Sequence, residues 1–161
     1  MDICKDILPR GAGWVIKRRL FWLDTLLEFW QERARSIASG EGFAQLLGIK
    51  FVSAAPNRVE LLMPYKGALG IGRVHGGAIS ALIDIAATAA FWSHPDVTQE
   101  SRGATVGFTV NFLALAVATD LTATASVRRR GGTLCTGDVS IQNAAGDEVA
   151  TAIVTYKLTA R

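Results

Sequence analysis

The sequence predicts an α+β protein in which an antiparallel β-sheet wraps around one central apolar helix. Two observations lead to this prediction. Residues 76–92 are an almost entirely apolar run of helical length, and four segments after residue 102 have the composition of strands separated by short turns. Strands joined by consecutive hairpins pair antiparallel, and one face of the resulting sheet has to cover the apolar helix.

The strands are bounded by clear turn signals. We expect them at residues 49–54, 58–64, 103–113, 120–130, 133–142 and 148–158. The pair Pro56–Asn57 separates the first two, and Gly131–Gly132 closes a hairpin later in the chain. Apolar and polar residues alternate along residues 120–130, which predicts one buried and one exposed face. A short helix over residues 43–47 precedes the first strand.

An amphipathic helix is expected over residues 14–37, because Ile16, Leu20, Leu23, Leu27 and Trp30 recur at steps of four and three. Charged residues interrupt it too often for a membrane span or a signal peptide. Two roles remain open for this helix. It covers the sheet or a subunit interface, which we favour, or it contacts a membrane surface through Lys17, Arg18 and Arg19. We divide the chain into a helical extension, 1–42, and one domain, 43–161.

Composition excludes several classes of function. The net charge of +3 and the absence of a basic stripe give no indication of nucleic-acid binding. The two cysteines, Cys4 and Cys135, do not form a disulfide framework, and they fit a cytoplasmic location. With two histidines and no cluster of cysteine and histidine, the sequence predicts no metal site.

Asp84 is the one charged residue of the central helix. Helical spacing places it on one face with Gly77, Ala81 and Thr88, all small or polar, while apolar residues cover the rest. A buried carboxylate is costly unless partners compensate, so this face is expected to border a small polar cavity. The alternative is a structural Asp paired with a core arginine or with backbone amides.

The helix is preceded by a glycine-rich loop, Gly70 to Gly77, that contains His75. Backbone N–H groups at a helix start favour negative charge, so Gly76 and Gly77 could hold an oxyanion. The loop is not a dinucleotide-binding fingerprint, because His75 stands where the third glycine is required.

His75 and Asp84 are nine residues apart, which is about 13 Å along a helix. They therefore cannot both contact one carbonyl carbon from within a single chain. Either only one of them matters, or the site joins the loop of one subunit to the helix of another.

Three features resemble one known family: His75-Gly76-Gly77, the acid nine residues later, and the strand with Val110-Asn111-Phe112-Leu113. They are similar to the hotdog-fold acyl-CoA thioesterases of the 4-hydroxybenzoyl-CoA thioesterase superfamily, in the branch named after the phenylacetate-degradation thioesterase. The resemblance covers residues 43–159. It implies a homodimer or a dimer of dimers with active sites at the dimer interface, and an acyl-CoA substrate.

The resemblance also implies roles for single residues. Asp84 would attack the thioester or activate water, and the Gly76 N–H would bind the oxyanion. Gly77 would allow close approach, His75 would shape the loop, and Thr105 would orient the acid or the water. The alternative for Thr105 is an ordinary strand threonine. Many relatives carry Asn or Gln six residues before the histidine, where this chain has Leu69.

Coenzyme A phosphates need cationic partners. Arg128, Arg129 and Arg130 end a strand and could supply them, with Arg73 as a further candidate; the alternative is a solvated hairpin end. Asn111 and Phe112 are expected along the substrate tunnel. No cofactor is expected beyond the coenzyme A of the substrate. The second functional hypothesis is a non-catalytic hotdog protein that binds acyl-CoA as a sensor or carrier, which Leu69 favours; a hydratase is a third.

Overall fold

The computed structural model describes residues 29–40 and 42–159. Residues 29–35 are helical and continue into η1 (Ser36–Gly40), after which come α2 (Gly42–Leu47), β1 (Lys50–Ala55) and β2 (Arg58–Met63). A short turn, η2 (Gly67–Leu69), leads to the long helix α3 (Gly76–Trp92). The remaining elements are β3 (Arg102–Phe112), β4 (Leu121–Arg130), β5 (Leu134–Asn143) and β6 (Glu148–Thr159).

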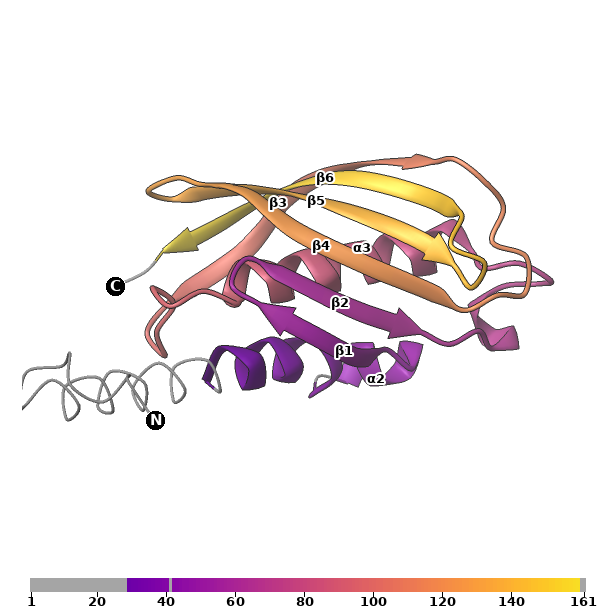
Figure 1. Cartoon of the computed structure of the whole chain (residues 1–161), viewed down its shortest axis with the longest axis horizontal. Helices are drawn as coiled ribbons and strands as arrows, with labels where there is room; N and C mark the ends of the chain where they lie inside the picture. Colours follow the sequence, from indigo (N-terminus) through magenta and orange to yellow (C-terminus); the bar gives the residue numbers. More distant parts are fainter. Residues whose placement is uncertain (1–28, 41, 160–161) are drawn as a thin grey trace, which may run out of the picture.

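The six strands form one antiparallel sheet in the order β1-β2-β4-β5-β6-β3. The sheet curves around α3, which packs against the inner faces of β2 to β6 (Figure 1). This is the architecture that the sequence predicts, and each expected strand is present within one or two residues of its expected bounds.

Helix α3 is the core of the molecule. Leu82, Ile83, Ala86 and Ala89 are fully buried, and burial of a leucine or isoleucine side chain contributes about 2 kcal/mol. His75 caps its first turn, because the His75 Nδ1 accepts a hydrogen bond of 2.9 Å from the Gly77 N–H. The Asp84 side is less buried than the others, as predicted from the small and polar residues there.

The N-terminal helical segment, residues 29–40, packs against α3 and β1. Its small residues Ala34 and Ala38 are fully buried, and Trp30 is nearly so. In Figure 1 this segment and α2 lie together beside β1. The part of the predicted helix before residue 29 lies outside the described residues. No helix within 29–40 or 42–159 is long and apolar enough to cross a membrane.

Of the four register shifts in the sheet that the structure describes, two change which predicted site residues face α3. The pairing register shifts between Thr105 and Gly107 in β3, and between Val127 and Arg129 in β4. Because strand side chains alternate between faces, one extra residue moves all that follow to the other face. The alternation expected along residues 120–130 is therefore interrupted near its end.

Candidate active site

Asp84 lies at the middle of α3 and is half-buried. The Thr105 hydroxyl donates a hydrogen bond of 2.6 Å to the Asp84 Oδ1. No other hydrogen bond to this carboxylate is present in the described part of the chain. Within the described residues, neither a salt bridge with an arginine nor a hydrogen bond from a backbone amide to Asp84 is present.

The bulge in β3 is what turns Thr105 toward Asp84. Phe108, Val110 and Phe112 face inward, opposite Val154, Ala152 and Ala150 of β6. Strict alternation backwards from Phe108 would turn Val106 inward. Since the extra residue sits between Thr105 and Gly107, Thr105 faces inward instead and Val106 is 60% exposed.

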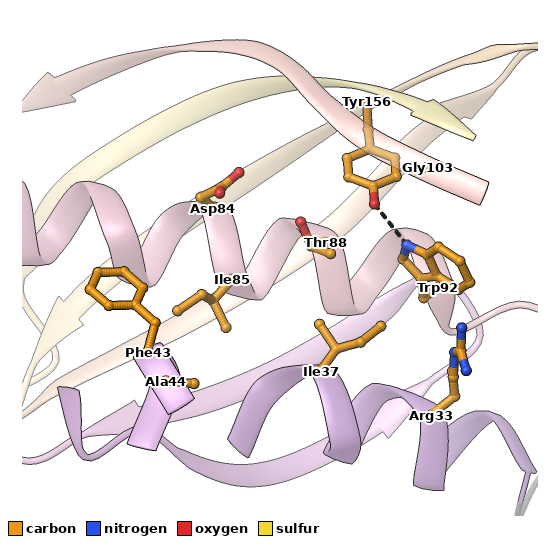
Figure 2. Close-up of a pocket in the computed structure, with 10 residues that line it drawn as sticks. All are labelled: Arg33, Ile37, Phe43, Ala44, Asp84, Ile85, Thr88, Trp92, Gly103 and Tyr156. Carbon is orange, nitrogen blue, oxygen red and sulfur yellow. Dashed lines mark hydrogen bonds between the residues drawn. The ribbon is translucent and has the colours of Figure 1, made fainter. Parts of the chain in front are cut away.

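A cavity of about 370 Å³ borders Asp84 (Figure 2). Its walls come from α3, from the N-terminal segment and α2, and from β3 and β6. The lining residues are Arg33, Ile37, Phe43, Ala44, Asp84, Ile85, Thr88, Trp92, Gly103 and Tyr156. Asp84 therefore borders a cavity, as its surroundings in the sequence predict, and the cavity is large enough for an acyl group.

The glycine loop is held in place by backbone hydrogen bonds. The His75 N–H donates to the Leu69 carbonyl at 2.8 Å, and the Val74 N–H donates to the Ala116 carbonyl at 2.9 Å. Gly70 has φ +153°, and a Cβ there would lie 2.0 Å from the Arg73 carbonyl oxygen. Only glycine fits that position, so the shape of the loop depends on Gly70.

Gly76 is the first residue of α3. Its N–H has no acceptor in the described residues, whereas the Gly77 N–H is used by His75. Gly76 lies against the ring of Phe112. The free donor at a helix start is the group that an oxyanion requires.

The loop borders a second cavity, of about 350 Å³, and Asp84 does not line it. Its lining residues are Arg73, Val74, His75, Gly76, Ile79, Phe112, Ala114, Leu115 and Ala116. Within one chain, the structure thus brings together Arg73, His75, Gly76 and Phe112, and separately Asp84 and Thr105. The two groups do not share a cavity, in agreement with the distance along the helix.

The arginines at the end of β4 are not one cluster. The bulge near Arg128 places Arg130 opposite the buried Cys135, on the inner face. Arg130 donates to the Phe91 carbonyl at 2.7 Å and to the Asn57 Oδ1 at 2.6 Å. Bonds to the last carbonyls of a helix stabilise its C-terminal end, so Arg130 caps α3.

Burial, which has the largest effect, and the positive charge of Arg130 lower the pKa of the neighbouring His94 below its ordinary value. The negative charge of Asp96 acts in the opposite direction.

Arg128 and Arg129 are exposed. Arg128 forms a salt bridge with Asp138 of β5. Asn111 lies on this outer face too, since it lines a cavity of about 250 Å³ together with Arg128 and Asp138. Asn111 and its neighbour Phe112 thus belong to opposite faces of β3.

Several residues of the Asp84 cavity were not predicted as site residues, above all Arg33, Trp92 and Tyr156. Arg33 lies in the same N-terminal segment as Trp30, which belongs to the periodic apolar pattern. Such a pattern shows that one face of the helix is buried, but it does not show which other element packs against that face. Tyr156 is one of the inward positions of the last strand, and nothing local distinguishes it from the core.

The family of the chain follows from comparison with known proteins. Residues 71–150 match the family model of the thioesterase superfamily. A thioesterase family protein from Silicibacter pomeroyi is 30% identical, with a TM-score of 0.73 over 81% of this chain and 98% of that one. The chain belongs to this superfamily, and the predicted hotdog fold is confirmed.

Two further solved structures are similar. The PaaI protein of the E. coli phenylacetic acid degradation operon is 25% identical, with a TM-score of 0.72 over 82% of this chain and 94% of that one. Zebrafish thioesterase superfamily member 2 is 26% identical, with a TM-score of 0.68 over 81% of this chain and 96% of that one. No curated protein matches the chain.

Proposed function

We propose that this protein hydrolyses acyl-CoA thioesters to a free acid and coenzyme A, in a site shared between two subunits. The observation that carries the proposal is the Asp84 carboxylate, oriented by Thr105 at the border of a cavity, in a member of the thioesterase superfamily. The test is release of coenzyme A thiol from aryl, short-chain and long-chain acyl-CoA thioesters.

Two routes are open to Asp84. As a general base, its Oδ2 takes a proton from water while the water oxygen attacks the thioester carbonyl carbon. The tetrahedral intermediate then expels the thiolate, which receives that proton. As a nucleophile, Oδ2 attacks the carbonyl carbon, and the C–S bond breaks to give an anhydride and the coenzyme A thiolate. Water then hydrolyses the anhydride to the acyl carboxylate and the Asp84 carboxylate, and of the two protons released, one goes to the thiolate and the other to solvent. In both routes, the Gly76 N–H of the other subunit donates to the oxygen that becomes negative. The mechanism uses no cofactor beyond the coenzyme A of the substrate.

Thr105 acts in this scheme as a positioning residue. Thr105→Val keeps the side-chain shape and removes the hydrogen bond to the Asp84 Oδ1. We expect kcat to fall about tenfold with little change in KM, because one hydrogen bond to a charged group is lost. Thr105→Ser keeps the hydroxyl and should restore most of kcat. Equal losses in both variants would mean that Thr105 serves only packing.

The edge strand β3 supports a shared site. It pairs with β6 on one side, and its other edge is unpaired in the described chain. Exposed apolar side chains follow this strand and the loop after it: Val106, Phe108, Phe112, Leu113 and Leu115. A long exposed edge with apolar side chains is a template for pairing with a second chain.

A twofold pairing of β3 with its copy would join the two groups that one chain keeps apart. Thr105, bonded to Asp84, lies in the first half of β3, while Phe112, against Gly76, is its last residue. In an antiparallel pair, the first half of one strand faces the second half of the other. Asp84 of one subunit would then approach Gly76 of its partner.

Arg128 and Arg129 remain candidates for the coenzyme A phosphates. Replacing both by Ala should raise KM for acyl-CoA about tenfold and hardly affect an acyl-pantetheine thioester, which lacks the nucleotide. Arg130 is left in place because it caps α3. Lys50→Ala with Arg58→Ala removes the same charge from β1 and β2 and is the control. If the Arg128/Arg129 double variant and the Lys50/Arg58 double variant changed KM equally for acyl-CoA and for acyl-pantetheine, a specific contact of Arg128 and Arg129 with the phosphates would be contradicted.

The non-catalytic alternative rests on Leu69. This residue is 6% exposed and packs in the core, so no side-chain amide is available at that position. Binding of acyl-CoA without thiol release in the assay above would favour the sensor or carrier. The cytoplasmic location, inferred from the cysteines, is part of the proposal and is tested by cell fractionation.

A further inference from the structure

The cavity beside Asp84 carries opposite charges at its two ends. Among its lining residues, Asp84 and Arg33 are the charged ones. Figure 2 shows Arg33 next to Trp92, at the other end of the cavity from Asp84 and Phe43. Arg33 comes from the N-terminal segment, which lies before the residues that match the family model. The far end of the cavity is therefore formed in part by a residue outside the match to the family model.

The Arg33 guanidinium has an unused donor. Its Nε is shielded from solvent and makes no hydrogen bond in the described residues. The guanidinium carbon lies 4.6 Å from the centre of the Trp92 ring, which holds its plane in place. A buried donor without an acceptor is destabilising, and guanidinium groups match carboxylates best. Arg33 also forms no salt bridge in the described residues, so an acidic group in the cavity would meet an uncompensated positive charge there.

The aromatic residues around Arg33 form a rigid wall. The Trp92 Nε1 donates to the Tyr156 hydroxyl at 2.8 Å, and Tyr156 stacks on Phe91 at 5.1 Å between ring centres. The indole donor is thus already used within the wall itself. A Cβ at Gly103 would lie 2.4 Å from the Tyr156 ring, so the absence of a side chain there keeps this wall in place.

The rise of α3 between Asp84 and Trp92, which packs against Arg33, gives a scale for the acyl group. Asp84 and Trp92 are eight residues apart on α3, or about 12 Å. Polar contacts of about 3 Å at each end leave about 6 Å. An extended chain covers this distance in about five bonds, since three backbone bonds span about 3.5 Å. Five bonds separate the two carbonyl carbons of an adipoyl group.

We propose that this enzyme prefers acyl groups with a carboxylate at their far end, and that Arg33 binds this carboxylate. The inference rests on the proposed function, because it assumes that the thioester carbonyl lies at Asp84. Arg33 then determines substrate specificity from a helix that carries none of the catalytic residues. Its positive charge excludes no acyl group sterically, but it increases the affinity for an anionic one.

The test compares adipoyl-CoA with hexanoyl-CoA, which differ only in the distal carboxylate. We expect wild-type kcat/KM to be at least tenfold higher for adipoyl-CoA. Arg33→Met keeps the apolar stem over Trp92 and should reduce this ratio at least tenfold, mainly through KM. Arg33→Lys keeps the charge and should retain part of the preference.

Arg35→Met is the matched control, because Arg35 lies on the same helical segment but stacks on Phe51, 4.7 Å from its ring centre, outside the cavity lining. It removes the same charge and should leave the ratio unchanged. A wild-type preference for hexanoyl-CoA, or equal losses with both substrates in Arg33→Met, overturns the inference. If neither this pair nor the aryl, short-chain and long-chain thioesters are hydrolysed, the proposed function fails, and calorimetric affinities of wild type and Arg33→Met for adipoyl-CoA and hexanoyl-CoA then decide whether Arg33 binds the carboxylate.

Discussion

Asp84→Asn is expected to lower kcat for acyl-CoA at least about 100-fold while the fold is retained. The amide keeps the size of the side chain, and its oxygen can still accept the Thr105 hydrogen bond. It removes the group that takes a proton from water or attacks the carbonyl carbon. Thiol release measures kcat, and circular dichroism with thermal melting shows that the protein is folded.

Two further variants make this result specific. Asp96→Asn removes a carboxylate from an exposed loop away from the Asp84 cavity and should leave kcat unchanged. Thr105→Val, added to Asp84→Asn, should cause no further loss, because Thr105 acts through the carboxylate that is already gone. Near wild-type turnover in folded Asp84→Asn would contradict catalysis by Asp84 in either role.

The fold could be predicted from sequence because its signals are local. The apolar run from Gly76 to Trp92 and the turn residues between strands fix the elements, and short hairpins leave few ways of pairing them. The bulges at Thr105–Gly107 and Val127–Arg129 could not be predicted, because strand alternation shows no extra residue until the partner strand is known.

These bulges determine where several of the predicted site residues lie. One turns Thr105 toward Asp84, as the family resemblance implies, although strict alternation from Phe108 would not give this contact. The other divides three consecutive arginines, so that Arg130 caps α3 while Arg128 stays on the outer face. Arg33 was missed for another reason. Its position at the cavity depends on how the N-terminal segment packs on α3. The periodicity of apolar residues within a helix does not predict which other element the helix packs against.

The second prediction concerns the origin of the two halves of the site. Gly76 and Asp84 are eight residues apart on α3, or about 12 Å, and they border different cavities. If the site is shared, Asp84→Asn and Gly76→Pro subunits should complement each other. Gly76→Pro removes the N–H at the first helical position, where proline is tolerated.

A control separates the N–H from the side chain that proline adds. A Cβ at Gly76 would lie 3.2 Å from the Phe112 ring, which has to move by only a few tenths of an ångström to make room for it. Gly76→Ala adds that carbon and keeps the N–H, so it should retain most of the activity. If Gly76→Ala were as inactive as Gly76→Pro, crowding of Phe112 would explain the loss, and the Gly76 donor would have no role.

Each variant alone should be inactive, and co-refolding equal amounts should restore up to about a quarter of wild-type activity. Random pairing makes half of the dimers mixed, and in each mixed dimer one site has both defects while the other has neither. Differently tagged subunits, purified in tandem, show that mixed dimers are present. If purified mixed dimers stay inactive, the loop and the acid act from the same chain, and the twofold pairing of β3 proposed for the active dimer is wrong.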